Sequence, residues 1–290
     1  MSLADLLHQH WGIRDSTVTA LGGGMNSNTW RVEHVGATYV AKEVPHGQLP
    51  QLAAGCEVAV RLAEAGLTTG RPVPTMRGSL VVSDPAMALL EHVPGRELDG
   101  VSGEEQRWMA DTLAAVHAAG ETAAGPTTAD FFEWLTRDAP GVGAHPWLPS
   151  AINEVRAEVD PLNLTWSVLH TDPAPEAFVH DDKTGMTGLI DWTGAGRGPV
   201  LYDVASAVMY LGGPEPAAAF LGAYREHGVL CGDEWQHLDA LRRFRWAVQA
   251  AYFARRIAHA DMTGVDGEAD NERGLGDARH GLARLGLTAT

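Results

Sequence analysis

The chain has 290 residues, 45% of them hydrophobic and 20% charged, and 37 acidic against 21 basic residues give a formal net charge of −16. This length allows two substantial cores, and the mean hydropathy of −0.12 is typical of a water-soluble globular protein. So acidic a chain repels nucleic acid and anionic membranes, which excludes both as expected partners, and it attracts cations. Two cysteines are too few for a disulfide framework and predict a reducing compartment.

The first residues, MSLADLLHQHWG, have neither the basic region nor the apolar core of a signal peptide. The sequence also has no apolar run of about 18 residues, the length that a membrane-spanning helix needs. We therefore expect a cytoplasmic protein. Residues 1–15 have apolar side chains at helical spacing and predict the first helix.

A glycine-rich turn between two short strands follows this helix. Residues 18–21 and 29–35 have strand character, and LGGGMNSNTW joins them. The backbone N–H groups of such a turn can cover phosphates. An ordinary β-turn explains the same residues equally well, and the P-loop spacing is absent.

The next strand, residues 38–44, carries Lys42. Only Lys42 and Lys183 are lysines, and all other basic residues are arginines. A lysine that persists against this bias indicates a need for its compact ammonium group. Residues 51–65 then predict a helix, with Glu57 at the border of its apolar face.

Residues 79–83 and 87–92 predict a further strand pair, and Pro94-Gly95 ends it. The remainder of the chain is mostly helical by its apolar spacing, with a capping box at Ser102 and Glu105 opening the first of these helices. Helices are predicted over 102–119, 130–137, 150–159, 202–211, 216–227, 233–259 (one helix or two) and 275–285.

The most informative stretch is VLHTDPAPEAFVHDDKTGMTGLIDWTGAGRGPVLYD, residues 168–203. An apolar run leads into His170 and Asp172, and the two prolines that follow impose an irregular loop. A hairpin is predicted over residues 178–190, and it ends on Asp191. The hairpin would bring the two aspartates together, an arrangement that suits metal-assisted chemistry on a phosphate.

These residues resemble the aminoglycoside phosphotransferase family, a branch of the protein-kinase-like fold, in which the two segments read about H-G-D-x-x-x-x-N and I-D-W or I-D-F. The resemblance implies an α+β, bilobal fold. A small antiparallel β-rich N-lobe would span residues 1–93 and bind nucleotide. A larger, mainly helical C-lobe would span residues 94–290 and hold the catalytic loop and the acceptor.

The resemblance also assigns roles to four residues of this stretch. Asp172 would be the catalytic-loop aspartate and His170 the loop histidine, so both are the expected catalytic residues. Asp191 would bind Mg²⁺, and Asp203 would brace the loop from behind.

Two positions depart from the family pattern. Thr171 replaces the usual glycine, a change that we expect to be minor. Ala177 stands where the family has an asparagine that holds a magnesium ion. The number of metal ions, one or two, therefore remains open. Glu176 could supply the missing oxygen ligand.

The resemblance further implies a nucleotide site in the N-lobe. Lys42 would hold the α- and β-phosphates of ATP and pair with Glu57, with Glu64 as the rival partner. ATP is the expected donor, with GTP as the alternative and Mg²⁺ as the cofactor. The glycine-rich turn would cover the triphosphate, and an interlobe hinge would take the adenine edge. The expected contacts are Gly23, Gly24, Asn26, Ser27, Glu91 and Val93.

Residues 259–277 form the most acidic segment of the chain. A solvated loop is the plainer interpretation of such a charge run. In the resembled family, however, the C-terminal helices and loops line the acceptor pocket with acids. The expected acceptor contacts are Asp261, Asp266, Glu268 and Asp270.

The sequence therefore favours an ATP-dependent O-phosphotransferase acting on a small cationic antibiotic, an aminoglycoside or a basic peptide such as a tuberactinomycin, and conferring resistance. One alternative is a metabolic kinase for a sugar, a choline-like amine or an amino alcohol, because the same fold serves all of them. The other is a pseudokinase that binds nucleotide without turnover. Ala177 favours the pseudokinase, whereas Lys42, Asp172 and Asp191 together argue against it. A monomer and a homodimer are both compatible with the sequence.

Overall fold

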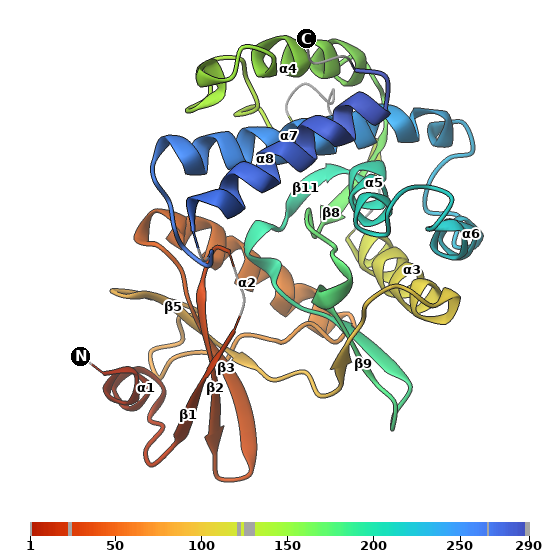
Figure 1. Cartoon of the computed structure of the whole chain (residues 1–290). Helices are drawn as coiled ribbons and strands as arrows, with labels where there is room; N and C mark the ends of the chain where they lie inside the picture. Colours follow the sequence, from red (N-terminus) through yellow and green to blue (C-terminus); the bar gives the residue numbers. More distant parts are fainter. Residues whose placement is uncertain (1, 23–24, 121–122, 125–130, 266, 288–290) are drawn as a thin grey trace.

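The computed structural model describes residues 2–22, 25–120, 123–124, 131–265 and 267–287 (Figure 1). The chain forms an N-terminal antiparallel sheet followed by a mainly helical C-terminal region. This confirms the expected α+β, kinase-like architecture. None of the described helices is both long and apolar enough to cross a membrane.

The N-terminal sheet has five strands in the order β1-β2-β3-β5-β4, and all of its strand pairs are antiparallel. Its strands are β1 (Thr17–Leu21), β2 (Asn28–His34), β3 (Ala37–Glu43), β4 (Val82–Ser83) and β5 (Ala86–Glu91). The expected glycine-rich turn joins β1 to β2, and β3 carries Lys42 through the middle of the sheet.

Two helices cover the sheet. Helix α1 (Leu3–Trp11) packs through Leu7 on one face, against Ala41, and helix α2 (Leu49–Glu64) packs on the face that includes Ala88. Because successive side chains of a strand point to opposite faces, Lys42 lies on the same face as α2. Figure 1 shows α2 between the sheet and the helical region.

Helix α1 is shorter than the predicted residues 1–15. Ser2 and Asp5 form a reciprocal capping box at its start. Gly12 ends the helix in the left-handed conformation, with a φ of 71°.

After β5 the chain crosses through residues 92–95 into β6 (Arg96–Glu97), which pairs with the predicted hairpin. That hairpin is β9 (Phe178–Asp181) and β10 (Met186–Leu189). A second three-stranded sheet has the order β11-β8-β7. It consists of β7 (Ala123–Ala124), β8 (Thr165–Leu169) and β11 (Gly196–Pro199).

The C-terminal region is built from six α-helices among the described residues. They are α3 (Gly103–Ala119), α4 (Leu148–Val159), α5 (Val200–Tyr210), α6 (Ala218–Glu226), α7 (Leu238–Ala258) and α8 (Glu268–Arg284). Short 3-10 turns lie between them and earlier in the chain: η1 (His46–Gln48), η3 (Val142–Ala144), η4 (Pro175–Ala177), η5 (Trp192–Gly194) and η6 (Glu234–His237).

Two helix predictions in this region were wrong. The described part of residues 130–137 forms turns, and Phe132 adopts a positive φ of 50° that a helix cannot accommodate. Helix α8 begins at Glu268, not at residue 275, so the predicted acidic loop is partly helical. Acidic side chains in the first turn favour a helix start because they face the positive end of its dipole.

Helix α5 lies at the centre of the C-terminal core. Its residues from Val200 to Met209 are all buried, and it packs against α7 and β8. Helix α8 approaches α7 closely, because Gly274 lies against the Phe253 ring and Gly281 against the Trp246 ring. These contacts fix α5 and α7, the two helices that reach the candidate site.

The contact between α2 and η5 also depends on a glycine. A Cβ added at Gly55 would lie 2.1 Å from the Trp192 carbonyl oxygen, far inside van der Waals contact. Trp192 is itself fixed, because its indole N–H lies 2.9 Å from the Leu189 carbonyl oxygen and 3.1 Å from that of Thr69. Helix α2 is thereby seated directly on the segment that follows Asp191.

We expect Gly55→Ala to destabilise the fold by about 1–3 kcal/mol, because the added methyl group must push the η5 backbone or α2 aside. Gly222→Ala is the matched control, since Gly222 lies in α6 with open space around its Cβ position. That change should be neutral or stabilise by up to about 1 kcal/mol. Urea denaturation of both variants measures the difference, and equal midpoints would contradict the proposed close contact.

Candidate active site

The site is organised around the buried carboxylate of Asp203, which α5 carries into the core. Its Oδ2 accepts the backbone N–H of His170 at 2.7 Å, and its Oδ1 accepts that of Thr171 at 2.9 Å. The His117 Nε2 lies 3.1 Å from Oδ2 on the other side. As expected from the resemblance, Asp203 braces the loop of residues 170–172.

Side chains of the same loop bind the segment after β10. The His170 Nε2 lies 2.8 Å from the Ile190 carbonyl oxygen, and because a carbonyl only accepts, this nitrogen carries the proton. The Thr171 hydroxyl donates to the Gly194 carbonyl oxygen at 2.9 Å. These two bonds tie the segments that present Asp172 and Asp191. For His170 they provide a structural contact, and its expected catalytic role remains a prediction.

Thr171 explains why the family pattern has a glycine at its position. Its φ is 73°, in the left-handed region that a β-branched residue rarely adopts. Such a conformation costs about 1–2 kcal/mol in a residue with a Cβ. The substitution is therefore not minor, and the hydrogen bonds to Asp203 and Gly194 hold the residue in this conformation.

Asp172 projects from this loop with its side chain 60% exposed. Its Oδ1 accepts hydrogen bonds from the Arg245 Nη2 at 2.8 Å and from the Tyr210 hydroxyl at 2.5 Å. Burial raises the pKa of Tyr210 well above its ordinary value, against the opposing effect of the Arg245 charge, so the hydroxyl keeps its proton. Asp172 is thus both accessible and held in place.

Arg245 and Tyr210 were not identified from the sequence. Arg245 is only 6% exposed and is also bonded to Ser206 of α5, at 2.9 Å. A signal was present, because Arg245 occupies a helical position between the apolar residues Leu241 and Val248. A charged side chain in an apolar stripe requires a buried partner.

Lys42 lies opposite this loop, buried to 6% exposure, and its ammonium group donates to the Asp191 Oδ1. Partial removal from water disfavours the charged carboxyl group, but the Lys42 ammonium group outweighs this effect and holds the pKa of Asp191 below its ordinary value. Asp191 itself has a φ of 67°, which an aspartate tolerates better than most residues. The side chain stays 57% exposed beside the buried lysine.

The expected ion pair between Lys42 and Glu57 is not formed. Lys42 pairs with Asp191, and Glu57 is exposed on α2. The seating of Gly55 on η5 fixes the rotation of α2 about its axis and leaves Glu57 in solvent. The rival partner, Glu64, lies 3.5 Å from Arg71.

The turn between β1 and β2 is tied to α7. The Met25 carbonyl oxygen accepts from the Arg256 Nη1 at 2.8 Å, and the Asn26 Oδ1 accepts from the Tyr252 hydroxyl at 2.7 Å. Gly23 and Gly24, two of the expected phosphate contacts, lie outside the described residues. The described part of the turn is therefore placed by the C-terminal region.

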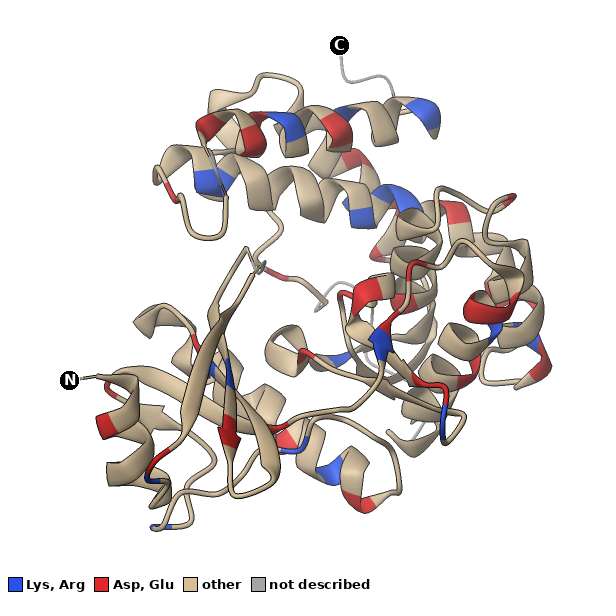
Figure 2. Cartoon of the chain, turned by 60° about the horizontal axis from the view of Figure 1, so that its bottom comes forward, with Lys and Arg blue, Asp and Glu red and all other residues tan. Residues whose placement is uncertain are grey.

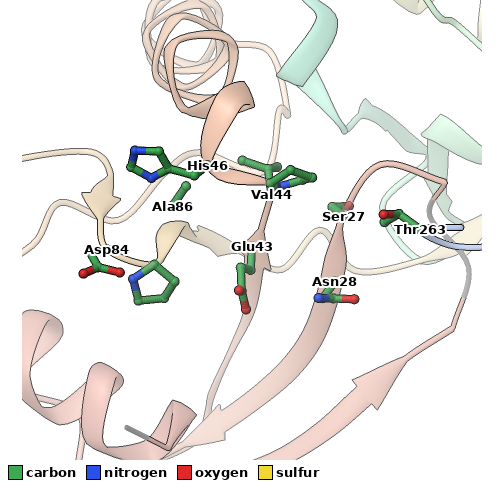
Figure 3. Close-up of a pocket in the computed structure, with 10 residues that line it drawn as sticks. Ser27, Asn28, Glu43, Val44, His46, Asp84, Ala86 and Thr263 are labelled. Atoms are coloured by element: carbon green, nitrogen blue, oxygen red, sulfur yellow. The ribbon is translucent and has the colours of Figure 1, made fainter. Parts of the chain in front are cut away.

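Ser27 lines a cavity of about 310 Å³ at the end of the sheet, together with Glu43, Asp84 and Thr263 (Figure 3). Glu43 follows Lys42 in β3 and so points to the opposite face. Figure 3 shows these polar side chains around the hollow between β2, β3 and the turn at Asp84. Neither Lys42 nor Asp191 lines this cavity.

The expected hinge is fixed on both sides by backbone hydrogen bonds. The Glu91 N–H donates to the Arg71 carbonyl oxygen at 2.8 Å, and the His92 N–H donates to that of Thr38 at 3.2 Å. A Cβ added at Gly188 of β10 would lie 3.0 Å from a Val93 methyl group. Glu91 and Val93 thus join the sheet to β10, and their contact with adenine remains a prediction.

The donor set fits a magnesium ion shared with a nucleotide. Within the part of the chain that the structure describes, no three His, Cys, Asp or Glu side chains gather into a metal cage. Mg²⁺ is often held by one or two carboxylates together with substrate phosphates. The exposed side chain of Asp191 can provide one such carboxylate. Glu176 is exposed in η4, and its charge acts on Tyr210, so it lies on the Asp172 side of the site.

The acidic residues of the C-terminal segment are partly engaged within the chain. Asp261 accepts the Thr263 N–H at 3.0 Å and lies 3.5 Å from Arg256, while Asp270 pairs with Arg273 at 3.1 Å. Glu268 starts α8, and Asp266 lies outside the described residues. The cartoon in Figure 2, with Asp and Glu in red, shows acidic residues in both parts of the molecule, so they are not concentrated in this segment.

A larger cavity, of about 700 Å³, opens between α7, α8 and the β1–β2 turn. Its described lining includes Met25, Gln249, Phe253, Asp270 and Asp277. The Gln249 Oε1 lies 3.3 Å from the Arg245 Nη1, and Arg245 contacts Asp172. Arg245 therefore connects Gln249, which lines the cavity, to the exposed Asp172 through two hydrogen bonds.

Comparison with known proteins places this chain in a family. The model of the phosphotransferase enzyme family matches residues 17–241. A search of curated protein sequences found no match.

Solved structures share the fold. An amicoumacin kinase in complex with AMP-PNP and Ca²⁺ has a TM-score of 0.73 at 14% identity, over 97% of this chain and 92% of that chain. Choline kinase LicA from Streptococcus pneumoniae has a TM-score of 0.72 at 16% identity, over 97% and 98%. A spectinomycin phosphotransferase in complex with ADP and its substrate has a TM-score of 0.68 at 12% identity, over 98% of both chains.

The family match covers more than half of the chain, and it agrees with the kinase-like fold of the solved structures. The chain belongs to the phosphotransferase enzyme family and is a small-molecule kinase.

Proposed function

We propose that this enzyme transfers the γ-phosphoryl group of ATP to a hydroxyl group of a small cationic molecule. The observation that carries the proposal is the exposed Asp172 carboxylate, held on a rigid loop that is hydrogen-bonded to the segment of Asp191. On this proposal residues 1–93 bind the nucleotide and residues 94–290 bind the acceptor. The pseudokinase alternative is disfavoured because an accessible, oriented aspartate has no evident use in a protein that only binds nucleotide.

In the proposed reaction, Asp172 accepts a hydrogen bond from the acceptor hydroxyl and directs its oxygen toward the γ-phosphorus. The bond from this phosphorus to ADP breaks as the new bond forms, and the hydroxyl proton passes to the Asp172 carboxylate. Lys42 contacts the phosphates through its ammonium group. Mg²⁺, when held by Asp191, neutralises phosphate charge. The transition state of such transfers is loose, so the protein contributes mainly position and charge.

The cavity between α7 and α8 is the proposed acceptor site. Its volume of about 700 Å³ falls in the range of pockets for drug-sized ligands and exceeds what a choline-sized amine requires. The exposed carboxylate of Asp277 and the ring of Phe253 suit an amine-bearing molecule. These features favour a cationic antibiotic of aminoglycoside or tuberactinomycin type, whose phosphorylation would confer resistance.

A metabolic role on an amino alcohol is the second candidate. It is supported by the fold shared with choline kinase LicA and with an aminopropanol kinase, which has a TM-score of 0.65 at 18% identity. Turnover of a panel containing aminoglycosides, tuberactinomycins, choline and aminopropanol, with Mg²⁺ and ATP or GTP, separates the two candidates. A preference for neutral sugars would contradict both.

Asp172→Ala should lower the turnover number by about 10²–10⁴-fold, because it removes the group that orients the acceptor hydroxyl. Binding of ATP, measured by calorimetry, should stay within about twofold of wild type, since a nucleotide site at Lys42 does not include Asp172. Asp138→Ala, at an exposed turn, is the matched control. If Asp172→Ala kept most of the wild-type turnover, the assignment of Asp172 as the catalytic aspartate would be wrong.

Lys42→Arg should reduce kcat/KM for ATP by about tenfold or more, equivalent to about 1.4 kcal/mol. The charge is retained, but the broad guanidinium fork cannot occupy the buried position of a compact ammonium group. The only other lysine supplies the control, because Lys183 lies in the exposed turn between β9 and β10. If Lys42→Arg and Lys183→Arg behaved alike, Lys42 would be an ordinary strand lysine.

Asp277→Asn should raise KM for the cationic acceptor by about 1.5- to 5-fold, the effect of one exposed ion pair. Increasing salt from 0.02 to about 0.5 M should raise the same KM in the wild type and less in the variant, because such attractions are screened over about 10 Å at 0.1 M. KM for ATP should change little. Glu104→Gln on α3 is the control, and an acceptor KM insensitive to salt would argue for an uncharged substrate.

A further inference from the structure

One face of α7 carries four polar side chains in register. Arg245, Gln249, Tyr252 and Arg256 are spaced by four, three and four residues, so they lie along the same side of the helix. At 1.5 Å per residue this row spans about 16 Å. Most of the helix around it is packed in the core. A polar row of this length in a buried helix requires partners, and its two ends have different ones.

The Arg245 end holds Asp172. The guanidinium group is anchored by the Ser206 hydroxyl at 2.9 Å and donates to the Asp172 Oδ1 at 2.8 Å. The Tyr210 hydroxyl, 3.0 Å from the Arg245 Nη2, donates to the same oxygen. Among the described residues no side chain donates to Oδ2, so one oxygen is held while the other stays available.

The Arg256 end holds the β1–β2 turn. Arg256 is 1% exposed and donates to the Met25 carbonyl oxygen at 2.8 Å. The same guanidinium group donates through its Nε to the Oδ1 of Asn271, a residue of α8, at 2.8 Å. Tyr252, one turn before it, donates to the Asn26 Oδ1 at 2.7 Å.

We propose that this face of α7 sets the distance and orientation between Asp172 and residues 25–26 of the turn that we expect to cover the phosphates, with Arg245 and Arg256 as positioning residues. The inference rests on the proposed function. A continuous helix is stiff over 16 Å, whereas the loop and the turn that it joins are irregular. In-line transfer depends on such stiffness, because a misplacement of about 1 Å can cost about 10²-fold in rate.

The two ends have different kinetic consequences. Loosening the Arg245 end displaces the group that orients the acceptor and should lower kcat. Loosening the Arg256 end displaces the turn over the nucleotide and should raise KM for ATP. If the two arginines served only to stabilise the fold, their partners would affect stability without this division.

Tyr210→Phe and Tyr252→Phe test the two ends, because each removes a single hydroxyl and keeps the ring. Tyr210→Phe should lower kcat about 10- to 100-fold and leave KM for ATP within about twofold, because it removes one hydrogen bond to a charged acceptor. Tyr252→Phe should raise KM for ATP about 3- to 10-fold and leave kcat within about twofold, because its lost bond is to a neutral acceptor. Tyr39→Phe is the control, since Tyr39 packs on the α1 face of the sheet, away from Lys42. The double variant should combine both effects nearly independently.

Arg245→Lys supplies a second probe of the first end. A lysine keeps the charge but cannot contact Ser206 and Asp172 together, so kcat should fall further than in Tyr210→Phe. The inference is overturned if both tyrosine variants alter the same kinetic constant, if neither differs from Tyr39→Phe, or if Arg245→Lys has wild-type kcat.

If the proposed function itself is wrong, the result differs from a failure of the inference about α7. In that case the wild type would transfer no phosphate to any acceptor of the panel. Calorimetric binding of AMP-PNP with Mg²⁺ then still tests the Arg256 end. Binding about 3- to 10-fold weaker in Tyr252→Phe but not in Tyr39→Phe supports the inference, and equal binding in both overturns it.

Discussion

The candidate site depends on a single buried carboxylate. Asp203 is inaccessible to solvent, and an unpaired charge there would be strongly unfavourable. The backbone N–H groups of His170 and Thr171 satisfy it, together with His117. The same bonds keep Thr171 in a conformation that it would otherwise avoid and turn Asp172 toward solvent. Stability of the core and geometry of the loop are therefore consequences of one interaction.

Both exposed aspartates follow a common electrostatic rule. Asp172 contacts the buried Arg245, and Asp191 contacts the buried Lys42. A buried cation needs an anionic partner, and an exposed carboxylate becomes more ordered when it contacts a cation that is fixed in the core. One cation comes from the central strand of the sheet and the other from α7, so each part of the molecule controls one acid of the site.

Local patterns allowed much of the fold to be predicted from the sequence. The strand around Lys42, the hairpin of β9 and β10 and the loop at Asp172 depend on alternation, turn residues and prolines that lie close together in the chain. Arg245, Tyr210 and Arg256 were missed because their partners are distant in the sequence; Asp172 and Arg245, for example, are 73 positions apart. The Lys42–Glu57 pair was wrong because the contact of Gly55 with Trp192, which sets the rotation of α2, has no local signature.

The hydrogen bonds from Arg256 to Met25 and from Tyr252 to Asn26 join residues 231 and 226 positions apart. Together with the covalent crossover at residues 92–95, the Lys42–Asp191 ion pair and the contact of Gly55 with Trp192, they connect the N-terminal part to the helical region at several separate places. A sheet held at separate places cannot rotate about residues 92–95 alone unless the other contacts are released. If the nucleotide binds here as proposed, we expect its exchange to require only the local release of Met25 and Asn26 from α7.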